Sequence, residues 1–77
     1  MAVGYVLVNV SPGKEYDAFK TIKEIENVGD TTILFGDYDI IAKLEDNDLT
    51  KIARTVVETI RQVPGVINTK TLAGADI

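Results

Sequence analysis

The residues best suited to chemistry form one short stretch, Gly36-Asp37-Tyr38-Asp39, which lies between two apolar runs. It combines a glycine, two carboxylates and a phenol. The carboxylate of Asp39 could accept the ammonium group of a small molecule, and exposed amides around Gly36 could bind a carboxylate. An α-amino acid carries both groups, so the stretch predicts an amino-acid site.

The same stretch has plainer interpretations. Gly36 permits a positive φ, Asp37 is a usual turn residue, and Asp39 could be an exposed strand side chain. These explanations fit Asp39 and Tyr38 less well, because aspartate is depleted in strands.

Catalysis would need a base or an acid and base pair, and no basic residue neighbours the carboxylates in sequence. Two carboxylates alone also make a poor metal site, since calcium takes six or more oxygens. We expect neither a catalytic residue nor a metal ligand.

Two threonines near the end of the chain, Thr69 and Thr71, fall on one face of a predicted strand. Their hydroxyl groups suit two roles: threonine is a common strand residue, and its hydroxyl can line a polar pocket. Both interpretations stay open at the level of sequence.

Composition excludes several classes of function. The chain has 77 residues and neither cysteine nor histidine, so disulfides and the usual zinc, copper and haem ligands are absent. We expect no cofactor. The formal net charge of −4 disfavours direct nucleic-acid binding, which needs clustered basic residues. The longest apolar run, residues 2–10, is too short for a membrane span or a typical signal peptide. The sequence predicts one soluble, cytoplasmic domain, residues 1–77, with no membrane partner.

The elements that position the candidate residues follow from hydrophobic periodicity. Strands are expected at residues 3–10, 30–35, 38–45 and 66–72, with a loose tail at 73–77. The first helix is expected at residues 12–26, capped by Ser11 and with Pro12 at its first position. Gly36-Asp37 is expected to form a two-residue type II′ hairpin turn.

The second helix has the clearest amphipathic pattern in the chain. Acidic and amide side chains of residues 46–48 provide its capping oxygens. Its apolar stripe consists of Leu49, Ile52, Ala53, Val56, Val57, Ile60 and Val63. Lys51, Arg54, Glu58 and Arg61 fall off this stripe and are expected to form a solvated face, where Glu58 can interact with Arg54 or Arg61.

The resulting order, β-α-β-β-α-β, predicts an α+β, ferredoxin-like fold with both helices on one face of a four-stranded antiparallel sheet. The first expected strand is apolar on both faces, and the third adds Ile41 to the uncovered face. A second copy could bury that face, and the gain would be comparable to the stability of a small domain. We therefore expect a homodimer packed sheet to sheet.

Two segments together resemble the Lrp/AsnC ligand-binding domain, also called the RAM domain. They are the Gly36 to Asp39 turn followed by Ile-Ile-Ala, and the ending Val-Pro-Gly-Val-Ile-Asn-Thr-Lys-Thr at 63–71. The resemblance implies sheet-to-sheet dimers that assemble into higher oligomers, with amino-acid effectors bound between dimers near this turn. By position it implies ligand contacts from Gly36, Asp37, Tyr38, Asp39, Thr69 and Thr71.

The chain departs from the family pattern in two ways. Phe35 is bulkier than the small or hydroxylated residue often found before the glycine. The 77 residues do not include the helix-turn-helix domain of full-length regulators, so we expect a stand-alone protein or an excised effector domain. We favour the former, a transcription-regulation effector that could act by co-assembling with DNA-binding relatives. The alternatives are an ACT-like amino-acid-binding regulatory module, a small cofactor-free ferredoxin-like enzyme, and an assembly domain without a ligand.

Overall fold

The computed structural model of the protein describes residues 1–75 and contains the predicted β-α-β-β-α-β order. Its elements are β1 (Ala2–Val10), α1 (Glu15–Lys23), β2 (Val28–Ile33), β3 (Ile40–Asp46), α2 (Leu49–Glu58), the 3₁₀ helix η1 (Ile60–Gln62) and β4 (Val66–Ala73). Ala73 thus ends β4 instead of opening the tail, and the last two tail residues lie outside the described part.

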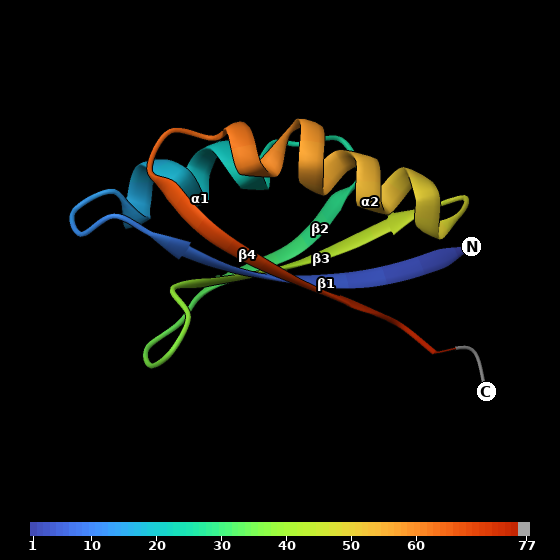
Figure 1. The fold of residues 1–77 in the computed structure, drawn as a ribbon, viewed down its shortest axis with the longest axis horizontal. Helices are drawn as coiled ribbons and strands as arrows, with labels where there is room; N and C mark the ends of the chain where they lie inside the picture. The colour runs from blue at the N-terminus through green and yellow to red at the C-terminus, as the bar shows by residue number, and fades with distance from the viewer. Residues whose placement is uncertain (76–77) are drawn as a thin grey trace.

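The four strands form one antiparallel sheet in the order β2-β3-β1-β4, and both helices cover the same face (Figure 1). The central strands β1 and β3 pair from Ala2 opposite Asp46 to Val8 opposite Ile40. The strand order and the one-sided helix layer confirm the predicted ferredoxin-like fold.

The core lies between the sheet and the helices, as the alternation along the strands predicts. Ile40, Ala42 and Leu44 of β3 are fully buried, whereas Ile41, Lys43 and Glu45 are on the other face and retain solvent exposure. The complete core consists of Val6, Val8, Val10, Ala18, Ile22, Ile40, Ala42, Leu44, Ile52, Val56, Ile60 and Val63.

The first helix begins later than predicted, and Ser11 does not cap it. Lys14 occupies the N-cap position without a side-chain hydrogen bond. The Lys14 amide instead donates to the Ser11 carbonyl at 3.0 Å, and Gly13 has a φ of +87°. Proline second and glycine third are typical of a type II turn, so Pro12-Gly13 forms a turn and not the first helical residues.

The β2–β3 connection is also longer than the predicted two-residue turn. The Leu34 amide donates to the Asp39 carbonyl at 2.8 Å, which leaves residues 35–38 as the loop tip. β2 lies at 28–33 instead of 30–35, and β3 starts at Ile40, so Tyr38 and Asp39 belong to the loop. Gly36 keeps the expected positive φ, +112°.

The apolar stripe of the second helix is narrower than predicted. Asp48 caps α2 as expected, since its Oδ1 accepts from the Lys51 amide at 2.9 Å. Leu49, Ala53 and Val57, one turn apart along α2, are exposed and do not belong to the buried core. The helix ends at Glu58 and continues as η1, which still buries Ile60.

The face of the sheet away from the helices stays open to solvent (Figure 1). Its apolar side chains are contributed by β1, β3 and β4 and are partly or largely exposed: Val3, Tyr5, Leu7, Ile41 and Leu72. We call these five residues the open-face patch.

Candidate functional site

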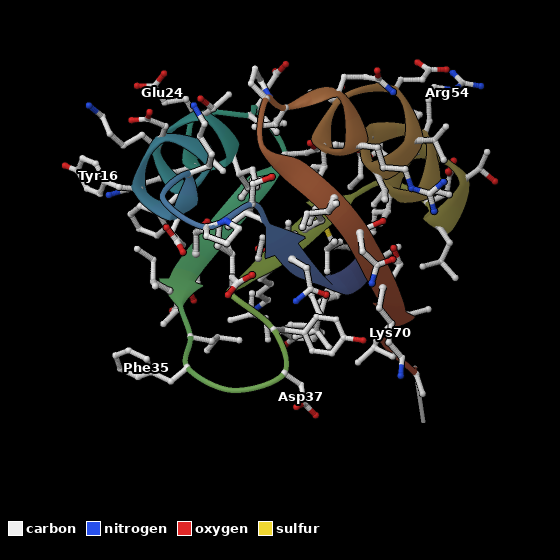
Figure 2. The ribbon with its side chains drawn as sticks, turned by 60° about the vertical axis from the view of Figure 1, so that its left-hand side comes forward. Tyr16, Glu24, Phe35, Asp37, Arg54 and Lys70 are labelled. Atoms are coloured by element: carbon white, nitrogen blue, oxygen red, sulfur yellow. The ribbon has the colours of Figure 1, made fainter. Side chains whose placement is uncertain are left out.

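The β2–β3 loop, residues 34–39, holds four of the six predicted site residues. It projects from the open side of the sheet (Figure 1), and Figure 2 shows Phe35 and Asp37 at its two flanks, pointing in different directions. Phe35 is fully exposed, and Gly36 and Asp37 are exposed, whereas Tyr38 and Asp39 are half-buried. A Cβ added to Gly36 would meet no atom within 4 Å, so only the backbone conformation requires glycine there.

Asp39 anchors this loop to the end of β1. Its amide donates to the Val8 carbonyl at 2.9 Å, and its Oδ2 accepts from the Val10 amide at 2.9 Å. Its Oδ1 makes no hydrogen bond with residues 1–75. One oxygen therefore fixes the carboxylate in place and leaves the other without a partner in the described chain.

Asn9 links the loop to the last strand, a role that the sequence analysis missed. Its Nδ2 donates to the Asp37 carbonyl at 2.8 Å, and its Oδ1 accepts from Asn68 Nδ2 at 3.3 Å. The signal was a single amide side chain within the apolar strand 3–10. Buried or half-buried amides need partners, so such a residue indicates a hydrogen-bond network.

Thr69 lies on the helix side of the sheet, opposite the buried Val8. Its Oγ1 accepts from Arg61 Nε at 3.1 Å. Arg61, Val66, Ile67, Asn68 and Thr69 line a groove of about 360 Å³ between η1 and β4. The prediction that Arg61 belongs only to a solvated face is therefore incomplete, because its guanidinium is held beside a candidate site residue.

The six predicted residues do not form one cluster within a single protomer. Gly36, Asp37, Tyr38 and Asp39 lie together in the loop on the open side, whereas Thr69 and Thr71 share the helix face of β4, as predicted from their spacing. Both groups belong to the same end of the sheet, where Val8 of β1 pairs with Ile40 on one side and Thr69 on the other.

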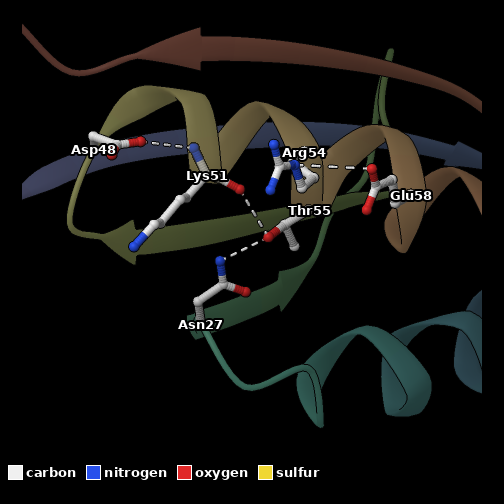
Figure 3. A network of polar contacts seen from close by, with 6 residues as sticks. All are labelled: Asn27, Asp48, Lys51, Arg54, Thr55 and Glu58. Atoms are coloured by element: carbon white, nitrogen blue, oxygen red, sulfur yellow. Dashed lines mark hydrogen bonds and ion pairs between the residues drawn. The ribbon is translucent and has the colours of Figure 1, made fainter.

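A larger groove, about 750 Å³, lies at the opposite end of the sheet and contains none of the predicted residues. Its lining includes a hydrogen-bonded network around Asn27, part of which Figure 3 shows. Asn27 Nδ2 donates to Thr55 Oγ1 at 2.8 Å and to Asp46 Oδ2 at 3.0 Å, and Thr55 Oγ1 donates to the Lys51 carbonyl at 3.0 Å. We call Asn27, Asp46 and Thr55 the Asn27 network.

Within this network, the carboxyl group of Asp46 has a lowered pKa. The Asn47 amide donates to its Oδ1 at 2.7 Å, which lowers the pKa of the Asp46 carboxyl below its ordinary value of 3.8. The Asn27 carboxamide and the Lys51 charge lower this pKa further, while desolvation opposes them. The hydrogen bonds to Asp46, chiefly the one from the Asn47 amide, thus favour its ionised carboxylate.

Residues 1–75 contain neither a cluster of metal-ligating side chains nor a membrane-spanning helix. No three acidic side chains there are grouped so that they could hold a metal ion. No helix in that range is long and apolar enough to cross a membrane.

Solved structures share the fold of this chain, and a family model gives its family. No curated protein sequence matches the chain significantly. Hypothetical protein PHS023 from Pyrococcus horikoshii is 25% identical, with a TM-score of 0.90 over 100% of this chain and 93% of that one. Escherichia coli AsnC is 14% identical, with a TM-score of 0.89 over 99% of this chain and 52% of its own.

The transcriptional regulator NMB0573 from Neisseria meningitidis, in a complex with L-Met, is 14% identical with a TM-score of 0.84. The match covers 97% of this chain and 50% of the regulator, so the chain spans about half of such regulators. The family model described as Lrp/AsnC ligand binding domain matches residues 3–73. That is a regulatory ligand-binding family and not an enzyme family, which favours the Lrp/AsnC resemblance over the ACT-like and enzymatic alternatives. The chain belongs to the Lrp/AsnC ligand-binding domain family.

Proposed function

We propose that this chain is a non-enzymatic effector module that binds an α-amino acid between subunits of a homo-oligomer and regulates transcription through DNA-binding relatives. The observation that carries the proposal is the Asp39 carboxylate, fixed through Oδ2 to the Val10 amide with Oδ1 available. A fixed carboxylate suits an ammonium group because it loses little freedom on binding. Family membership supports a regulatory role, and the L-Met bound to the Neisseria regulator supports an amino-acid ligand.

The placement of the predicted residues supports a site between subunits. The loop projects on the open side, while Thr69 and Thr71 face the helix side, so one chain cannot direct both groups at the same small ligand. Neighbouring subunits could, if the loop of one lies beside β4 of another. The site proposed from Gly36, Asp37, Tyr38, Asp39, Thr69 and Thr71 is therefore a composite of two chains.

The open-face patch supports the first step of assembly, a sheet-to-sheet homodimer. Leu7 pairs across the sheet with Ile41 of β3, and Tyr5 pairs with Leu72 of β4, so apolar side chains of three strands adjoin on this face, with Lys43 and Lys70 beside them. A buried apolar centre with a polar rim is usual for subunit interfaces. We propose that these dimers assemble further and bring loop and β4 together.

Isothermal titration of the assembled protein with each of the twenty amino acids tests this function, after sedimentation has given its mass. We expect at least one to bind, and Asp39→Asn to weaken that binding about ten- to hundredfold, because a charge-assisted hydrogen bond contributes about 1.5–3 kcal/mol. Asparagine keeps the shape and an acceptor for the Val10 amide. Asp30→Asn, an exposed carboxylate on β2, is the matched control. Absence of heat with all twenty amino acids would refute the ligand claim, and a monomeric mass would refute the composite site.

A further inference from the structure

We propose that Arg61 is the carboxylate-binding residue of the effector site, and that the groove between η1 and β4 receives a carboxylate of the ligand. This inference rests on the proposed function, because it adds a ligand contact to the same composite site. It also assigns a role to a residue that no sequence pattern connects with Thr69.

The hydrogen bond to Thr69 orients the guanidinium without using its terminal donors. Arg61 Nε donates to Thr69 Oγ1 at 3.1 Å, and this is the one hydrogen bond of its side chain within residues 1–75. The two terminal nitrogens, which bind carboxylates in a paired geometry, keep their donors available. Because the side chain is already held, less conformational freedom is lost when an anion binds.

The charge of Arg61 is uncompensated, unlike that of the arginine two turns earlier on α2. Arg54 Nε lies 3.9 Å from Glu58 Oε2, whereas Arg61 has no carboxylate oxygen within 4.0 Å among residues 1–75. The lining of the groove contains no acidic side chain, although the chain carries a net charge of −4. A positive groove in an acidic protein selects for a small anion.

Backbone geometry adds a further donor. The Gly74 amide donates to the Val3 carbonyl of β1 at 2.7 Å. Because every second residue of an antiparallel strand bonds to its neighbour, the register implies that Leu72, Lys70 and Asn68 also exchange hydrogen bonds with β1. The alternating residue Thr69 therefore directs its amide toward the free edge of β4. An amide and an oriented guanidinium beside one groove of about 360 Å³ form a site of the size and chemistry that a small carboxylate needs.

The carboxylate could be the α-carboxylate shared by all amino acids or the side-chain carboxylate of aspartate or glutamate. Matched ligand pairs distinguish them. The full chain is titrated with glutamate and glutamine, with aspartate and asparagine, and with the tightest ligand among the twenty. If Arg61→Gln weakens the binding of glutamate and aspartate alone, Arg61 binds the side-chain carboxylate. If it weakens the binding of the acids and their amides equally, Arg61 binds the α-carboxylate.

The test compares Arg61→Gln with Arg54→Gln. We expect Arg61→Gln to weaken binding about ten- to hundredfold, since the loss of a hydrogen bond between charged groups lowers affinity by about that factor. Arg54→Gln should change affinity less than twofold. Thr69→Val, which keeps the shape but removes the hydroxyl that holds the guanidinium, should give a smaller loss. Circular dichroism and thermal unfolding confirm that each variant is folded.

Several outcomes would overturn the inference. If Arg61→Gln binds every ligand as the unmodified chain does while Asp39→Asn has lost binding, the inference fails and the proposed function stands. If no amino acid binds, the proposed function fails, and glutarate, a dicarboxylate without an ammonium group, then tests the groove alone. Glutarate binding that Arg61→Gln abolishes would support the carboxylate site, and no glutarate binding would refute it.

Discussion

The two ends of the sheet contain the same kinds of polar side chain but differ in how those side chains are satisfied. At the end with the larger groove, the members of the Asn27 network bond mainly to one another and to the backbone. At the loop end, Asp39 keeps one free oxygen and Arg61 keeps two free terminal nitrogens within the described chain. Unused hydrogen-bonding capacity, more than groove volume, therefore distinguishes the proposed binding site from the Asn27 network.

Both ends of the sheet are expected to depend on one shared core. Core substitutions test this, and they have the largest expected effect on the free energy of unfolding. Leu44 near the Asn27 network and Ile40 near the loop are both fully buried. Leu44→Ala and Ile40→Ala should each lower the free energy of unfolding by about 2–5 kcal/mol, much of the stability of a small domain. Urea denaturation followed by circular dichroism measures this loss. A loss below about 1 kcal/mol for either variant would show that the two ends do not share one cooperative core, and Ile33→Ala on the exposed edge is the control.

Thr55→Val sharpens the contrast by removing a hydroxyl from the Asn27 network while keeping the shape of the side chain. Asn27 Nδ2 then loses its 2.8 Å partner, so the free energy of unfolding should fall by about 1 kcal/mol. Amino-acid affinity should stay within twofold, because the change lies at the opposite end of the sheet from the proposed site. Urea denaturation and the amino-acid titration measure the two effects. Weaker ligand binding with unchanged stability would contradict the contrast, and Thr50→Val, on an exposed residue of α2, is the control.

The sequence predicted the features that depend on periodicity. The order of strands and helices, the alternation of Ile40 to Glu45 and the Asp48 cap are confirmed, because each follows from spacing along one element. The predictions for Ser11 and for the Gly36-Asp37 turn were wrong, because a short Pro or Gly motif fits more than one local structure. Pro12-Gly13 could start a helix or form a type II turn, and the second choice also lets the Ser11 amide donate to the Gly65 carbonyl at 2.8 Å.

The candidate site was less predictable than the fold, because its contacts join distant residues. The Asp39 to Val10 bond spans 29 positions and the Asn9 to Asn68 bond spans 59, so no local pattern shows either. The Arg61 to Thr69 contact spans only 8 positions, yet it crosses the turn between η1 and β4. Sequence identified Asp39 and Thr69 as candidates, and only the fold could place Asn9 and Arg61 beside them.

The smallest expected effect is the pH dependence that Asp46 gives to stability. Its folded-state pKa is lowered, chiefly by the Asn47 amide, so folding favours the ionised form. The resulting stabilisation is fully present above the unfolded pKa near 4 and is lost as the pH falls through the lower folded pKa. Asp46→Asn should therefore reduce the loss of stability between pH 5 and pH 2 in urea denaturation. Asp30→Asn, whose side chain makes no hydrogen bond within residues 1–75, should leave that loss unchanged. If both variants retain the full acid dependence, the Asn27 network does not depend on an ionised Asp46, and the contrast between the two ends weakens.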